Sequence, residues 1–148
     1  MNTKHATAEQ QQQIRSVLDD WAQASQAKDV ERIISHYADD IVAFDAVGPL
    51  RFVGRDAYKA HWDFCMTVCP GPSLFELHQP TILVSGELAV SYALLHCGGT
   101  NEQGQMESSW MRVTQCLQQF GGQWRIVHEH FSAPFDMESG KASFDLQP

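Results

Sequence analysis

Residues 74–133 read LFELHQPTILVSGELAVSYALLHCGGTNEQGQMESSWMRVTQCLQQFGGQWRIVHEHFSA. This segment holds four stretches rich in apolar, β-branched and aromatic residues, separated by short glycine-containing turns. The stretches span residues 74–84, 87–98, 105–119 and 123–133. Because the turns are of hairpin length, we predict an antiparallel sheet whose strands follow one another in chain order. Pro80 indicates a sheet edge or a bulge in the first strand, since proline cannot donate a ladder hydrogen bond.

The segment before this sheet has the apolar spacing of helices. Thr7 followed by Gln10 is a capping-box pattern, and the helix behind it fades at Lys28. Asp29 is a suitable N-cap for a second helix that reaches Tyr37. Because almost no loop separates the two helices, we expect them to pack as an antiparallel hairpin.

A short strand over residues 41–45 follows these helices. Asp56 is a candidate cap for a third helix that runs to about Val68, and the CPGP sequence at 69–72 ends it, because proline cannot continue a helix. Three helices followed by a long curved sheet predict an α+β fold. The concave side of such a sheet is where a ligand is expected.

The composition favours one globular domain over residues 1–148, with a core of about 8–134 and a tail at 135–148. Apolar residues make up 43% of the chain, which argues against disorder. No run of 18 apolar residues predicts a membrane span, and the N-terminal residues MNTKHATAEQQQQ do not resemble a signal peptide. We therefore expect a cytoplasmic protein.

The charge excludes one class of partner. The net charge is −8, and the lysines and arginines form no cluster. A phosphate backbone has nothing to bind on such a surface, and anionic membranes are also disfavoured. The expected partner is a small hydrophobic or acidic ligand, with no nucleic acid and no membrane.

The four cysteines are Cys65, Cys69, Cys97 and Cys116, and no CxxC pair is present. His61, Cys65 and Cys69 fall on one stripe of the third helix, a spacing that metal ligands can have. Packing of the cysteines as small buried hydrophobes explains the same spacing. We therefore predict no metal and no cofactor.

Three segments carry a family resemblance. YADD at 37–40 and FDAVG at 44–48 resemble the second helix and following strand of ketosteroid isomerases. WRIVHEHFSAP at 124–134 resembles the last strand of SnoaL-like proteins, and is similar to that of the calcium/calmodulin-dependent kinase association domain. All belong to the nuclear transport factor 2-like superfamily. The resemblance implies a cone-shaped, cystatin-like fold with a curved antiparallel sheet packed on three N-terminal helices.

The resemblance implies that Asp45 occupies the position of the isomerases' proton-shuttling carboxylate. Their oxyanion-binding tyrosine corresponds to Trp21 here, and the strand over residues 107–119 lacks the aspartate that would assist it. The chain is therefore not expected to be a ketosteroid isomerase. A second interpretation of Asp45 is a strand-end residue that binds a neighbouring backbone N–H.

Alternation along the last two strands supplies further candidates. Period two places His128 and His130 on one face, which by the resemblance looks into the cavity. Arg112 lies on the preceding strand, where relatives have a pocket arginine, and could bind a carboxylate or an enolate oxygen. Each of these residues has an alternative role. Arg112 could form an ion pair on the surface. The two histidines could form hydrogen bonds in the interior, or they could bind a metal, although the sequence offers no third ligand at a suitable spacing. The expected pocket walls are Trp21, Tyr37, Trp110, Phe44 and Thr114.

These residues support a cofactor-independent isomerase, dehydratase or cyclase that removes a proton beside the carbonyl of an aromatic or polycyclic compound. Asp45 is the base in this hypothesis. The alternative is a non-catalytic ligand-binding or oligomerisation module, in which Asp45 would face solvent or an ion pair. A homodimer is expected through the convex sheet face. The apolar residues predicted on that face are Val90, Leu94, Val113 and Leu117.

Overall fold

The helices come first along the chain. The computed structural model describes residues 7–68 and 71–148, and its helices are α1 (Ala8–Gln26), α2 (Val30–Ile34) and α3 (Arg55–Val68). The predicted capping box is confirmed at α1: the Gln10 backbone N–H donates to Thr7 Oγ1 over 3.1 Å, and the Thr7 N–H donates to Gln10 Oε1 over 3.3 Å. Cys69, at the predicted stop of the third helix, lies outside the described residues.

The second helix is shorter than its apolar pattern predicts. Asp29 caps α2 as expected, accepting the Arg32 N–H over 3.2 Å. An ion pair between Arg32 and Asp20 joins α2 to α1. The expectation that the helix reaches Tyr37 is wrong, because Tyr37 is the first residue of a strand. The expectation for Asp56 is also wrong, since α3 begins one residue earlier and Asp56 lies in its first turn.

Six strands form one sheet in the order β2-β1-β6-β5-β4-β3. Strands β3 to β6 are antiparallel neighbours in chain order, as predicted. Strand β1 pairs with β6 in parallel, which hairpin spacing could not predict, because the two strands are far apart in sequence. The strands are β1 (Tyr37–Phe44), β2 (Phe52–Val53), β3 (Ser73–Ser85), β4 (Leu88–Thr100), β5 (Met106–Phe120) and β6 (Gln123–Ser132).

Both features predicted from Pro80 are present. Strand β3 is an edge strand, and its register with β4 shifts between His78 and Thr81. Gln79, inside this interruption, has a φ of 49°, a left-handed conformation that an extended strand does not contain. The irregular segment thus accommodates a residue that has no N–H for the ladder.

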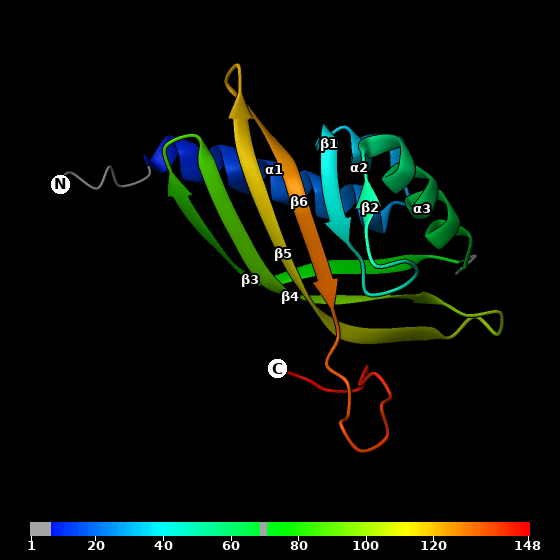
Figure 1. The fold of residues 1–148 in the computed structure, drawn as a ribbon. Coiled ribbons are helices and arrows are strands. Elements are labelled where there is room, and N and C mark those ends of the chain that lie inside the picture. The colour runs from blue at the N-terminus through cyan, green and yellow to red at the C-terminus, as the bar shows by residue number, and fades with distance from the viewer. Residues whose placement is uncertain (1–6, 69–70) are drawn as a thin grey trace.

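The sheet is strongly curved, with α1 lying across one face and α3 beside the edge that β1 and β2 form (Figure 1). The core lies between the sheet and the helices. Its residues on α1 include Ile14, Leu18 and Trp21. Val113 and Leu117 are also in this core, so their predicted position on the convex face is wrong. Within residues 7–68 and 71–148, no helix is long and apolar enough to cross a membrane.

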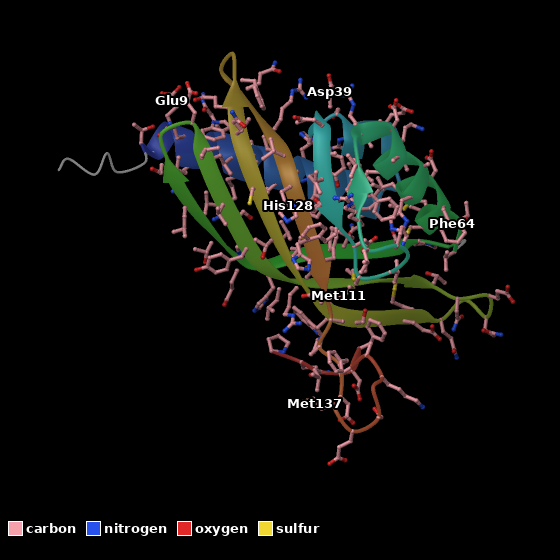
Figure 2. The ribbon with its side chains drawn as sticks, in the orientation of Figure 1. Glu9, Asp39, Phe64, Met111, His128 and Met137 are labelled. Atoms are coloured by element: carbon pink, nitrogen blue, oxygen red, sulfur yellow. The ribbon has the colours of Figure 1, made fainter. Side chains whose placement is uncertain are left out.

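The chain leaves the sheet after β6 as an exposed tail. A bridge between Phe135 and Ala142 closes the tail on itself, and Met137 lies at its exposed outer side (Figure 2). The tail therefore contributes no side chain to the core cluster.

Candidate functional site

A small apolar pocket lies between α3 and the concave face of the sheet. Its volume is about 220 Å³. The segment after β1, helix α3 and strands β3 to β6 contribute to its walls. The lining residues are Asp45, Ala46, Val47, His61, Trp62, Cys65, Phe75, Leu95, Cys97, Met111 and Phe131. Wider depressions on the outer surface, such as one of about 520 Å³ beside Trp124, are more open and less apolar than this pocket, so they enclose a ligand less well.

Asp45 and His61 form a hydrogen-bonded pair in the wall of this pocket. Asp45 follows β1 directly, and its Oδ2 contacts Nε2 of His61 on α3. The other carboxylate oxygen, Oδ1, accepts the Ala46 backbone N–H over 2.6 Å. The Asp45 side chain is only 16% exposed, and the Phe52 ring stacks on the His61 imidazole with centroids 4.3 Å apart. Asp45 therefore binds a neighbouring backbone N–H, as the second interpretation expects, and it also lines the pocket.

Cys65 lies one helical turn after His61, and its Sγ is 3.6 Å from the same Nε2 atom. Burial, with a smaller contribution from the charge of Asp45, raises the pKa of the Cys65 thiol to about 11. A thiol in that state is protonated at neutral pH and is a poor nucleophile. The three residues therefore do not make a cysteine–histidine–aspartate nucleophile, in which the thiol and the carboxylate would address opposite nitrogens of the ring.

Glu129 is a second buried carboxyl group, and sequence reasoning missed it. Its side chain has no exposed surface. Oε2 accepts hydrogen bonds from the Tyr37 hydroxyl over 2.8 Å and from the Tyr58 hydroxyl over 2.5 Å, and Oε1 accepts from Gln115 Nε2 over 2.7 Å. Burial outweighs these hydrogen bonds and raises the pKa of Glu129 to about 7.

A bulge in β6 explains why Glu129 points inward. Cys116 of β5 pairs with His128 and the next residue, Leu117, pairs with Ile126, so Val127 is an extra residue in β6. Trp124 and Ile126 point into the core before the bulge, and Glu129 and Phe131 do so after it. Period two had assigned the even-numbered residues to one face throughout.

The predicted placement of the two histidines in the cavity is therefore wrong. His130 is exposed, and His128 donates from Nδ1 to the Val42 carbonyl oxygen over 2.6 Å. Phe44 packs edge-on against both imidazoles. Phe44 is itself 37% exposed, so it does not form the expected pocket wall either.

The three candidates on β5 also lie on the outer face. Arg112 is exposed and donates from Nε to Ser132 Oγ over 3.0 Å. Trp110 stacks on His96, with ring centroids 4.4 Å apart, and Thr114 pairs with His130. Their inward neighbours, Met111 in the pocket and Val113 in the core, occupy the face that these residues were predicted to share.

Trp21 and Tyr37 are interior residues behind the pocket. The Trp21 indole contacts the pocket residues Phe75 and Phe131, and its Nε1 donates to the Tyr37 hydroxyl over 2.9 Å. The Trp62 ring also lines the pocket, while its Nε1–H is fully buried and lies toward the Tyr37 hydroxyl, away from the pocket space.

A curved sheet around a helix-capped pocket defines a protein of the nuclear transport factor 2-like class, and solved structures agree. An NTF2-like protein of unknown function from Pseudomonas putida KT2440 is 46% identical, with a TM-score of 0.89 over 96% of this chain and 99% of that one. The chain belongs to the SnoaL-like domain family, whose sequence profile matches residues 14–136.

More distant structures share the fold. A candidate scytalone dehydratase from Novosphingobium aromaticivorans is 14% identical, with a TM-score of 0.73 over 83% of each chain. A candidate aromatic ring hydroxylase from the same organism is also 14% identical, with a TM-score of 0.76 over 86% of this chain and 91% of that one. No curated protein matches the chain with significance.

Proposed function

We propose that this protein is a cofactor-independent isomerase or lyase that removes a proton beside the carbonyl group of a small ligand held in the Asp45 pocket. The observation that carries the proposal is the Asp45–His61 pair in an otherwise apolar wall. A binding module would be expected to turn this carboxylate to solvent or to a permanent cation. Here the side chain is mostly buried, and a lone pair of Oδ2 remains for a ligand proton.

The proposed reaction uses two groups of the chain. Asp45 takes the proton from the carbon next to the carbonyl, and the electron pair moves to the carbonyl oxygen as an enolate forms. Asp45 then returns the proton to another carbon, which completes an isomerisation, or to a departing hydroxyl, which completes a dehydration. His61 holds the carboxylate through Oδ2 during both steps.

The size of the pocket limits the ligand. A cavity of about 150 Å³ is enough for benzene, and this pocket measures about 220 Å³. One substituted ring fits such a space, whereas a polycyclic compound does not. We therefore propose a single-ring or short-chain carbonyl compound as the substrate class, which is narrower than the class favoured by the sequence.

The first test is a binding screen with cyclohexenones, hydroxybenzaldehydes and tetracyclic steroid enones, read by thermal shift and by ligand-observed NMR. We expect single-ring compounds to bind and steroids not to bind. Met111→Trp fills the pocket and should weaken binding at least tenfold, because it removes the ligand's space. Trp110→Ala, on the opposite face of the same strand, is the matched control and should bind normally. Tight binding by Met111→Trp would place the ligand elsewhere.

We also propose that two copies of the chain associate through the convex face of the sheet. Its outward apolar side chains include Val90, 36% exposed, and Tyr92, 48% exposed, which are alternate residues of β4 and so share a face. Burying such a patch against a second copy removes it from water. Light scattering should give about twice the 16.6 kDa chain mass at micromolar concentration. Tyr92→Asp should shift the protein to monomers, and a monomeric native protein would refute the association.

A further inference from the structure

We propose that Asp45, His61 and Cys65 form a binding site for a divalent transition metal of the zinc type, with an open coordination position that faces the pocket. One atom from each residue can serve as a ligand, and the three atoms all lie within 4.8 Å of one another. This inference does not depend on the proposed reaction, because it concerns what the three side chains bind.

The geometry fits one shared ion better than separate contacts. The carboxylate of Asp45 and the thiol of Cys65 both approach the same atom, Nε2 of His61. With zinc–sulfur and zinc–nitrogen bonds of about 2.3 and 2.0 Å at a tetrahedral angle, the two ligand atoms lie about 3.5 Å apart. Cys65 Sγ and His61 Nε2 are separated by 3.6 Å. A small outward movement of the Asp45 carboxylate would admit the ion in place of the shared proton.

The fold holds two of the three ligands in place before any ion binds. His61 and Cys65 are four residues apart on α3, so the helix fixes their spacing. The Phe52 ring stacks on the His61 imidazole and limits its rotation. Asp45 closes the set from the segment after β1. Sequence spacing had suggested Cys69 as the third ligand, and that residue lies outside the described range. The spacing could not show that Asp45 lies beside this helix in the fold.

The donor set selects the class of ion. One thiolate, one imidazole and one carboxylate suit zinc and its neighbours, whereas magnesium and calcium prefer oxygen ligands alone. The pocket leaves room for a water molecule or a ligand oxygen at the fourth position. Binding displaces the thiol proton of Cys65 to the solvent, and the proton that His61 Nε2 shares with Asp45 moves to Nδ1, so one proton is released in all. A bound ion would also occupy the lone pairs that Asp45 needs as a base.

The test is titration of the metal-free full-length protein with zinc, in competition with a chromophoric chelator, and with cobalt as a spectroscopic probe. We expect one ion per chain, release of about one proton per ion, a thiolate-to-cobalt charge-transfer band and a melting temperature higher by several degrees. Cys65→Ala should lose the band and bind zinc at least tenfold more weakly. Cys65→Ser, which preserves the side-chain size, should behave in the same way.

Cys97→Ala is the matched control, because Cys97 lines the same pocket and lies outside the three-residue cluster. It should bind zinc as the native protein does. Equal zinc affinity in Cys65→Ala and the native protein would overturn the proposal, as would an absence of binding at micromolar zinc. Neither outcome bears on proton abstraction by Asp45, which is measured without metal.

Discussion

Replacing Glu129 with glutamine is expected to remove a pH dependence of stability worth about 3 kcal/mol. The pKa of Glu129 is about 7 in the folded protein, against a model value of 4.5. Because the folded state keeps its proton more tightly, the stabilising contribution is complete below pH 4.5 and is lost as the pH rises through 7. Urea unfolding of both proteins at intervals from pH 4.5 to 8 measures the difference.

The difference between the native protein and Glu129→Gln should therefore move in favour of the variant as the pH rises. Glutamine keeps the shape of the side chain and remains neutral, so the Tyr37 and Tyr58 hydroxyls retain an acceptor oxygen. Glu87→Gln, at an exposed carboxyl group, is the control and should follow the native curve closely. A difference between Glu129→Gln and native protein that stays constant over this range would show that Glu129 is ionised throughout.

Asp45→Asn is expected to slow turnover of any substrate by roughly 10²- to 10⁴-fold, the usual contribution of a positioned general base. Asparagine keeps the oxygen that accepts the Ala46 N–H, so stability should change by about 1 kcal/mol or less. Ligand affinity should change little, because the walls of the pocket are mainly apolar. Steady-state rates and ligand binding, measured on the same preparations, separate these effects.

Two histidine variants make that test specific to the pocket. His61→Gln should also reduce the rate, because His61 holds the Asp45 carboxylate. His128→Gln should retain full activity, since His128 bonds the Val42 carbonyl outside the pocket. Loss of activity in His128→Gln together with an active His61→Gln would move the site to the outer face of the sheet.

The fold could be predicted from the sequence because its determinants are local. Several of these features each depend on residues within a few positions of one another. They are the capping box of Thr7 and Gln10, the Asp29 cap and the strand interruption at Pro80. Glycine turns of hairpin length then set the order of β3 to β6. The parallel pairing of β1 with β6 was not predictable in this way, because it joins segments that are far apart in the chain.

The site was predicted only in part, for two physical reasons. The single extra residue at Val127 reverses which side chains point inward, and such a bulge leaves little trace in composition. Because of that reversal, Glu129 points inward, where His128 and His130 had been predicted. The pairing of Asp45 with His61 depends on how α3 packs beside β1, which periodicity cannot give. The sequence predicted that His61 and Cys65 share one stripe of a helix, but it could not predict that Asp45 lies opposite that stripe.

The most direct test of the account is exchange of the carbon-bound proton beside the carbonyl of a ligand identified in the binding screen. The ligand is incubated with metal-free protein in deuterated buffer, and its proton signal is followed by NMR. We predict that native protein accelerates the exchange at least a hundredfold over Asp45→Asn, with both proteins saturated by ligand. A ligand that fills the pocket and exchanges no faster with native protein than with Asp45→Asn would contradict Asp45 as the base.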